Sequence, residues 1–190
     1  MPREQARESD SVKRFAIGSE GRGMEKQRGF SLIELLIVVA IILIIAAIAI
    51  PNLMRSKIAA NEASAVGSMR TINTAQVTYS SAWGTGYALA LANLGSVGAC
   101  GGATAAGACL IDPILSTGTK SGYTFKTAGT LLNGTVYNGF EANGTPVAVG
   151  QTGQRAFCSD QSGVIQFNTT GGAIGVAAGN CVAVNNPIGK

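Results

Sequence analysis

One uninterrupted apolar run constrains the fold of this 190-residue chain more than any other feature. Residues 35–50 are all Leu, Ile, Val or Ala, and the run extends back to Phe30 with only Ser31 and Glu34 as polar interruptions. About 20 residues of α-helix span the roughly 30 Å hydrocarbon core of a bilayer. The rest of the chain is too small to bury such a helix on all sides. The run therefore predicts one membrane-spanning helix over residues 30–50.

The charges on either side of the run predict its orientation. Residues 1–29 hold seven of the fourteen Lys and Arg residues, with Lys26 and Arg28 just before the run. Positive flanks favour the cytoplasmic side, and Arg55 and Lys57 on the far side weaken this asymmetry without reversing it. We therefore expect the C-terminal part to lie outside the cytoplasm, where disulfides between its four cysteines persist.

Glu34 distinguishes this run from an ordinary signal peptide or anchor. Secretory signals have a shorter apolar core, of roughly 7–15 residues. A carboxylate within an apolar segment costs roughly 3 kcal/mol, unless it reaches the interface or finds a partner. No Lys or Arg shares the helical face of Glu34 within the run. Cleavage between Gly29 and Phe30 would create a free amine as partner, in the same chain or in a neighbour.

A family resemblance rests on residues 26–42, which read Lys-Gln-Arg-Gly-Phe-Ser-Leu-Ile-Glu-Leu-Leu-Ile-Val-Val-Ala-Ile-Ile. This stretch is similar to the class III signal and N-terminal helix of type IV pilins and their relatives. Pro51, twenty-one residues after Phe30, lies where these pilins usually carry a helix-kinking proline. The resemblance implies that a prepilin peptidase cleaves after Gly29 on the cytoplasmic side and N-methylates Phe30. It implies little about the C-terminal domain, which varies widely among these proteins.

The leader implied by this resemblance, residues 1–29, is long for the family. Residues 24–29 form a complete six-residue leader by themselves. Residues 1–23 are polar and mixed in charge, which is typical of disorder. We expect translation to begin at Met24 and residues 1–23 to be a gene-start artefact, which N-terminal sequencing of the uncleaved precursor tests.

A cleaved helix of this kind can leave the bilayer only for another apolar environment. Copies of the same helix supply one by burying their apolar side chains together. Glu34 can then meet the Phe30 amine of an adjacent subunit and fix the register, because leaving either charge alone is costly. Repetition along an open screw axis gives a filament. The expected partners are therefore further copies of the chain and, for the precursor, the membrane. The resemblance to type IV pilins adds the prepilin peptidase and the inner-membrane pilus assembly machinery.

Residues 51–83 predict an amphipathic helix. Pro51 lacks a backbone N–H and is expected to kink or locally open the helix. Apolar residues then recur at steps of 7, 4, 3, 3 and 4, so they share one helical face, and the charged residues are mostly off that stripe. We expect the stripe to pack on the chain's own sheet. Its members are Ile58, Ala65, Met69, Ile72, Ala75 and Tyr79.

The remaining residues predict a loop followed by a sheet. Residues 84–121 are Gly- and Ala-rich and poorly periodic, which indicates a connecting loop with a short helix near residues 88–94. Residues 122–190 predict an antiparallel sheet and a C-terminal disulfide region. The fold class is therefore α+β, with a long N-terminal α-helix packed on a C-terminal antiparallel β-sheet, as in pilins. The predicted strands are 123–127, 135–140, 155–158 and 164–167.

The four cysteines allow three disulfide pairings. We favour Cys100–Cys109 and Cys158–Cys181, because each pair joins a flexible stretch to near neighbours. Zinc sites need closer Cys-x2-4-Cys spacing, which the sequence lacks. We expect no metal and no other cofactor.

Composition argues against catalysis and nucleic-acid binding. The chain has no His, which removes imidazole bases and ligands. Its exported part has five acids without a close pair in sequence, and Asp112-Pro113 is typical of a turn. The exported part also lacks a basic stripe that would bind nucleic acid.

We therefore expect a non-enzymatic subunit of a type IV pilus. It would begin as an inner-membrane precursor, with a single span and its C-terminus outside the cytoplasm, and end in an extracellular filament. The alternative is a pseudopilin or minor pilin of a type II secretion system, in a periplasmic pseudopilus. A membrane-anchored periplasmic enzyme or binding domain is disfavoured. Adhesion, motility, DNA uptake and secretion all remain open as uses of the filament.

Overall fold

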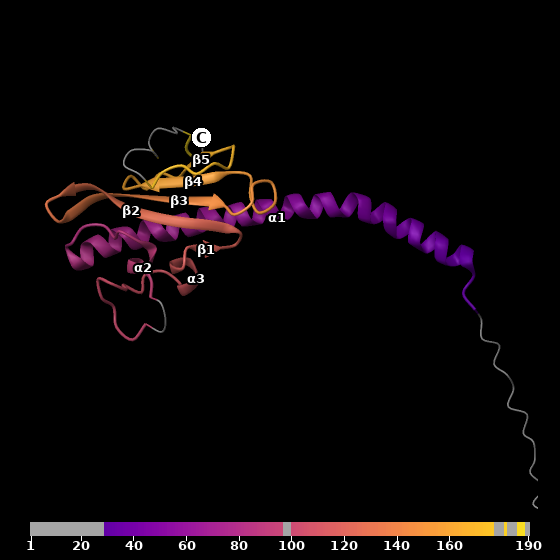
Figure 1. The fold of residues 1–190 in the computed structure, drawn as a ribbon, viewed down its shortest axis with the longest axis horizontal. Helices are drawn as coiled ribbons and strands as arrows, with labels where there is room; N and C mark the ends of the chain where they lie inside the picture. The colour runs from indigo at the N-terminus through magenta and orange to yellow at the C-terminus, as the bar shows by residue number, and fades with distance from the viewer. Residues whose placement is uncertain (1–28, 97–99, 177–180, 182–185, 189–190) are drawn as a thin grey trace, which may run out of the picture. The chain divides into compact units, whose positions relative to one another are not determined.

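The structure, a computed structural model, describes residues 29–96, 100–176, 181 and 186–188. The leader up to residue 28, including the proposed start at Met24, lies outside the described residues. Contacts divide the chain into two compact units, Met1–Ile42 and Leu43–Lys190. The helix α1, Leu32–Trp83, begins in the first unit and ends in the second (Figure 1).

The second half of α1 confirms the predicted amphipathic helix. Five of the six predicted stripe residues are buried, and Ile58 is half-buried. The helix continues through Pro51 and ends at Trp83. Among the charged residues of this half, which the sequence places mostly off the stripe, Glu62 is the exception and is buried on the same face. The buried stripe residues are Ala65, Met69, Ile72, Ala75 and Tyr79.

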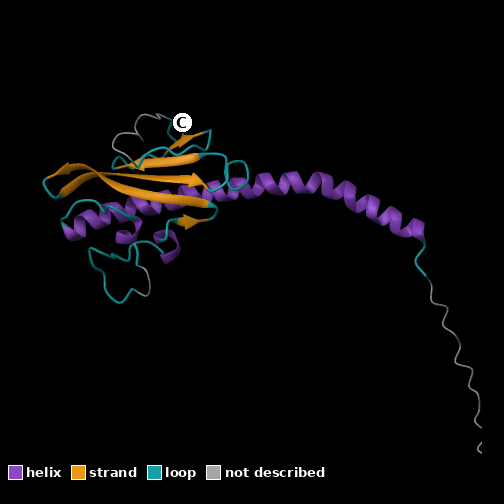
Figure 2. Ribbon diagram, viewed as in Figure 1, coloured by secondary structure: helices purple, strands orange, loops and turns teal. Residues whose placement is uncertain are grey.

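The predicted antiparallel meander is confirmed, with the sheet order β1-β2-β3-β4-β5. Each strand pairs antiparallel with the next one along the chain. Figure 2 shows the long central strands beside the second half of α1. The strands are β1 Thr119–Lys120, β2 Tyr123–Asn133, β3 Val136–Pro146, β4 Ala156–Asp160 and β5 Gln166–Asn168.

The hairpin of β2 and β3 is longer than its sequence pattern predicts. Alternation of apolar and polar residues stops at Thr127, but pairing runs on to Asn133 opposite Val136. The Tyr137 ring lies over Gly129, where an added Cβ would come within 2.7 Å of its Cγ atom. An aromatic ring over a strand glycine restores the packing that the glycine lacks. This cross-strand contact extends the hairpin beyond the locally predicted strands.

The predicted connecting loop contains more structure than expected. The short helix α2, Leu91–Leu94, falls within the predicted helical stretch, whereas the short helix α3, Pro113–Ser116, was not predicted. The Asp112 side chain caps α3 by accepting a hydrogen bond from the Leu115 backbone N–H at 3.0 Å. Asp112-Pro113, which the sequence predicts to be a turn, therefore begins this short helix, with Asp112 as the cap and Pro113 as the first helical residue.

The core lies between α1 and the sheet. Four aromatic side chains of the strands are at most 2% exposed and pack in one cluster with the buried stripe of α1. On the sheet, Cys158 of β4 joins Cys181 in a disulfide, and both residues are fully buried. Cys100 joins Cys109 in the connecting region. These are the pairs that the sequence favours. The four aromatic residues are Tyr123, Phe125, Phe140 and Phe157.

Candidate assembly site

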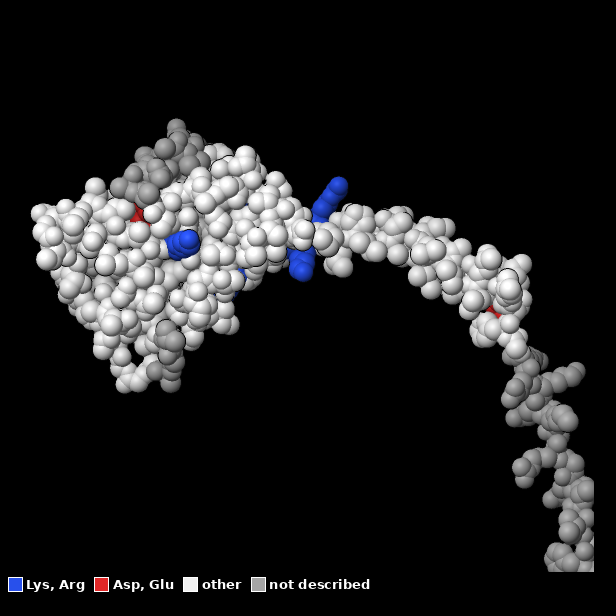
Figure 3. Space-filling model, viewed as in Figure 1, with Lys and Arg blue, Asp and Glu red and all other residues white. Residues whose placement is uncertain are grey.

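The apolar half of α1 is the first candidate site, because its side chains are exposed in the single chain. Large apolar residues from Phe30 to Met54 are between 44% and 80% exposed. Among the described residues, one helix, α1, is long and apolar enough to cross a membrane. Figure 3 shows the visible face of this stretch without charge between its ends. Water is a poor solvent for such a surface, so lipid or protein must cover it.

The charges of α1 mark the two ends of this surface. Glu34 lies in the first turn, where the helix dipole favours a negative charge. The next charged residues along the chain are Arg55 and Lys57, both exposed. The twenty residues between Glu34 and Arg55 rise about 30 Å as a helix, which equals the hydrocarbon thickness of a bilayer.

The predicted cleavage position precedes the helix. Gly29 and Phe30 are exposed and lie outside helix and strand, two residues or more before α1 begins at Leu32. A Cβ atom added to Gly29 would have no described atom within 4 Å, apart from those of Gly29 itself and its two neighbours in the chain. The first backbone hydrogen bond of the helix runs from the Leu35 N–H to the Ser31 carbonyl at 3.2 Å. The peptide bond between Gly29 and Phe30 therefore lies outside the helix, and no other described residue packs against Gly29.

The helix is held to the sheet by a clamp that the sequence analysis missed. Glu62 Oε1 accepts the backbone N–H groups of Gln154 at 2.9 Å and Arg155 at 3.0 Å. Glu62 Oε2 lies 2.8 Å from Arg155 Nε and 2.7 Å from its Nη2. The Arg155 guanidinium also lies over the rings of Phe157 and Phe167, at 5.7 and 5.3 Å from their centroids. Asn61 adds a hydrogen bond to the Thr152 carbonyl at 2.8 Å.

The clamp also sets the charge state of its members. Burial disfavours the charged form of Glu62, but the two backbone donors and the Arg155 guanidinium outweigh it and hold its pKa below 4.5. Burial, and next the Glu62 charge, raise the pKa of the Tyr123 hydroxyl, which donates to the Arg155 carbonyl at 2.8 Å. The sequence does indicate that Glu62 is buried, because it falls four residues after Ile58 and three before Ala65, on the apolar stripe. A lone carboxylate at such a position indicates buried hydrogen-bond donors or a cation as partners.

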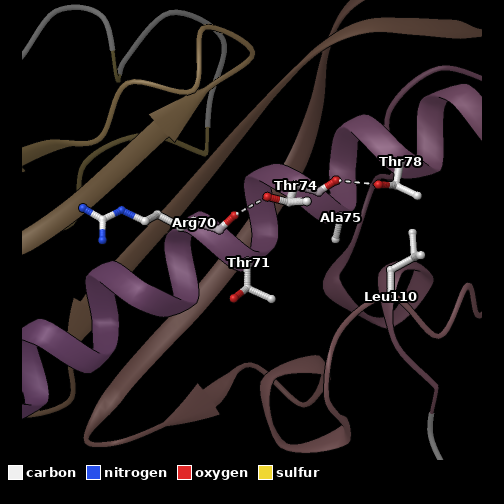
Figure 4. Close-up of a pocket in the computed structure, with 6 residues that line it drawn as sticks. All are labelled: Arg70, Thr71, Thr74, Ala75, Thr78 and Leu110. Atoms are coloured by element: carbon white, nitrogen blue, oxygen red, sulfur yellow. Dashed lines mark hydrogen bonds between the residues drawn. The ribbon is translucent and has the colours of Figure 1, made fainter.

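The exposed side of α1 carries a second candidate, a pocket of about 320 Å³ beside Leu110. Three threonines line it, and each hydroxyl donates to the carbonyl four residues earlier: Thr71 to Gly67, Thr74 to Arg70 and Thr78 to Thr74. The Arg70 side chain extends away from these threonines (Figure 4). The lining residues bring together no acid and base that could activate a hydroxyl.

The described residues hold no group of three or more Cys, Asp or Glu side chains placed to bind a metal ion. Asp112, considered as an acid in the sequence, forms an ion pair with Lys120 at 2.9 Å. Burial opposes its charge, but this lysine and the Leu115 N–H lower the pKa of the Asp112 carboxyl. Its geometry is that of a helix cap.

Comparison with known proteins relates the apolar half of α1 to a family. A family model described as the prokaryotic N-terminal methylation motif matches residues 24–50. The type IV major pilin protein PilA of Myxococcus xanthus (strain DK1622) is 46% identical to the chain over 54 residues. That match covers 28% of this chain and 24% of the relative. No solved structure matches the chain.

The motif and the fold agree on the class of protein. The methylation motif lies at the start of a long helix whose second half packs on an antiparallel sheet, which is the arrangement of pilins. The N-terminal part of the chain is similar to that of type IV pilins, and the family resemblance read from residues 26–42 is confirmed. The implied role of this class is structural, through assembly into a polymer.

Proposed function

We propose that the chain is a structural subunit of a type IV pilus, cleaved after Gly29, N-methylated at Phe30 and polymerised through α1. The observation that carries this proposal is the exposure of the apolar surface from Phe30 to Met54. Burying one Leu or Ile side chain contributes about 2 kcal/mol. Release of a single subunit into water would expose more than a dozen such side chains and is strongly disfavoured. Lipid tails are about as apolar as these side chains, so a bundle of like helices lets the subunit leave the bilayer without exposing this surface to water.

Glu34 gives this transfer its specificity. Cleavage leaves a positive amine on Phe30, four residues before the Glu34 carboxylate. In a bundle of apolar helices each charge is costly without the other, so packings that pair the carboxylate with an amine are selected. The amine of an adjacent subunit reaches Glu34 only when the two helices are shifted along their axes by one particular distance. The pair therefore sets register, whereas the apolar side chains keep the helix out of water, in lipid or in the bundle.

The localisation follows from the same surface. The precursor spans the inner membrane once, with the leader in the cytoplasm and the second unit outside. The prepilin peptidase acts at the cytoplasmic face, where Gly29 and Phe30 precede the helix. The pilus assembly machinery of the inner membrane then moves the mature subunit into an extracellular filament.

A pseudopilin or minor pilin of a type II secretion system is the alternative, because these proteins share the N-terminal segment. The name of the Myxococcus xanthus relative, a major pilin, favours the pilus role. The two disulfides suit a subunit exposed outside the cell, since cross-links restrict the unfolded chain.

Shearing surface filaments from cells that express the chain tests the proposal. We expect the chain to be the bulk protein of the sheared fraction, by mass spectrometry. Its confinement to the cell envelope, with surface filaments made of another protein, would contradict the pilus role and favour the alternative. Deletion of the prepilin peptidase is the control, and it should leave the chain in the membrane fraction at the mass of the uncleaved precursor.

A further inference from the structure

A small pocket lies where several segments of the second unit converge. Its volume is about 240 Å³, and its walls come from the end of α1, the loop that follows, α2, the Cys100–Cys109 loop and the β2–β3 hairpin. This volume is below the roughly 300–1,000 Å³ of sites for drug-sized ligands, so it suits one small ring. The lining residues used below are Tyr79, Thr85, Tyr87, Asn93, Thr135 and Tyr137.

The pocket combines aromatic surface with hydrogen-bonding groups and lacks charge. None of the residues that line it is charged. Tyr87 and Tyr137 are half-buried, so part of each ring remains accessible. A ring face accepts the apolar C–H groups of a ligand, and a phenol, hydroxyl or amide at the rim orients its polar groups. Phosphate, carboxylate or a cation would need an opposite charge that this pocket does not offer.

Several polar groups of the pocket are available to a ligand. The side-chain hydroxyls of Thr85, Thr135 and Tyr137 form no hydrogen bond with the described residues. The Asn93 Oδ1 atom accepts a hydrogen bond from the Ala90 backbone N–H at 3.2 Å. The two N–H donors of the Asn93 amide can therefore bind other partners. A ligand rich in hydroxyl groups would match this set of donors and acceptors.

The walls are fixed before any ligand binds. Gln76, fully buried, donates to the Ala88 carbonyl at 3.0 Å and accepts the Ala88 N–H at 2.8 Å, so it holds the loop after α1. The Tyr87 N–H donates to the Tyr137 carbonyl at 2.9 Å, which ties that loop to the hairpin. Tyr79 donates to the Ala105 carbonyl at 2.7 Å, within the disulfide-closed loop. A preformed site avoids the entropic cost of ordering its walls on binding.

We propose that this pocket binds a neutral carbohydrate, with one sugar ring against the accessible parts of Tyr87 and Tyr137. A sugar presents apolar C–H faces and a rim of hydroxyl groups without charge, which is the chemistry that the pocket matches. The proposal does not rest on filament formation, because every wall belongs to one chain. It adds a ligand site to a subunit whose assembly surface lies elsewhere on α1.

The test is a titration of the purified full-length chain in a detergent without a sugar headgroup. The probes are glucose, galactose, mannose and N-acetylglucosamine, each followed by tryptophan fluorescence and by saturation-transfer NMR. Trp83 is the single tryptophan of the chain, and its ring centroid lies 5.0 Å from that of Tyr79. We expect at least one of the four sugars to give a saturable change by both methods. No saturable change with any of them overturns the proposal.

Matched variants locate the binding. Thr85→Val with Thr135→Val removes two hydroxyls and keeps the side-chain shapes, so we expect binding weaker by roughly five-fold per hydroxyl. Tyr137→Ala removes the ring and should abolish saturation-transfer signals. Thr74→Val, in the other pocket, is the control and should bind as the unchanged chain does. Unchanged affinity in the double threonine variant, or an equal loss in Thr74→Val, overturns the proposal even if Tyr137→Ala disturbs the fold.

Discussion

Single polar residues on the buried face of α1 determine how the helix docks on the sheet. Glu62 and Gln76 are 7% and 0% exposed, and both lie among apolar neighbours. Each is matched by partners from distant segments, which makes its removal costly. Their positions fix the axial position and rotation of the helix, whereas apolar contacts alone tolerate small shifts.

Replacing Glu62 with Gln tests the clamp. The change keeps the side-chain shape but removes the charge that pairs with Arg155, so we expect a loss of about 2 kcal/mol in the free energy of unfolding at neutral pH. The folded-state pKa of Glu62 is lowered, so its contribution is present above pH 4.5 and is lost as the pH falls below that value. Urea titrations at pH 7 and pH 3, followed by Trp83 fluorescence, measure both effects.

The free energies of unfolding of the variant and the unchanged chain should therefore differ most at pH 7 and less at pH 3, because the contribution of the Glu62 charge begins to fall below pH 4.5. Lys126→Gln, at an exposed position of β2, is the control and should change stability by less than about 0.5 kcal/mol. A Glu62→Gln variant that differs from the unchanged chain equally at both pH values would contradict the role of the charge.

Replacing Gln76 with Leu tests the second buried residue. Leu cannot accept the Ala88 N–H or donate to the Ala88 carbonyl and the Thr127 hydroxyl, which lie 2.8, 3.0 and 2.9 Å from the amide. Leaving buried backbone groups without partners costs about 1–3 kcal/mol each, so we expect a total loss of about 3 kcal/mol. Urea titration at pH 7 measures it, with the exposed Thr78→Val as control. A loss below 1 kcal/mol would show that water replaces the amide.

The elements differ in how far local sequence determines them. The stripe of α1 and the meander are predictable because side-chain period and turn residues are local signals. The far half of the β2–β3 hairpin is not, because Gly129 breaks the pattern and Tyr137, on the other strand, restores the packing. The spacing of Glu62 places it on the buried stripe, although its charge alone favours an exposed position. Its partner Arg155, 93 residues away, carries no local signal.

The two disulfides are expected to respond differently to reduction. Cys158 and Cys181 are fully buried, whereas Cys100 is exposed. Thiol–disulfide exchange needs access of the attacking thiolate to sulfur, so Cys100–Cys109 should open first. Mild reduction of the folded chain, alkylation and peptide mapping measure the order. Labelling of Cys158 at or before the labelling of Cys100 would contradict the buried packing of the β4 disulfide.

At the scale of the whole molecule, the two ends of α1 meet different surroundings. The second half completes the core of its own unit, and the first half leaves its apolar side chains exposed. The apolar side chains of the first half must therefore be covered by lipid or by other protein molecules, such as further copies of the chain. The bilayer and, under the proposed function, a polymer are the two destinations that would cover this surface.

Glu34→Gln separates these destinations. The variant removes the charge without shortening the apolar run, so membrane insertion of the precursor should be unchanged or improved. Assembly should fall at least ten-fold, because the pairing that selects register is lost. Immunoblots of the sheared filaments and of the membrane fraction measure the ratio of assembled to membrane-bound protein. Lys57→Gln, beyond the apolar run, is the control, and normal filaments from Glu34→Gln would refute the pairing role.

The most direct test of the account is the N-terminal mass of the mature chain. Intact-mass and peptide mass spectrometry of the chain from sheared filaments should find a first residue of Phe30 carrying one added methyl group on its amine. That result requires cleavage after Gly29 and modification of the new terminus. A mature chain that begins at any other residue, or that retains residues 24–29 in the filament, would contradict the account.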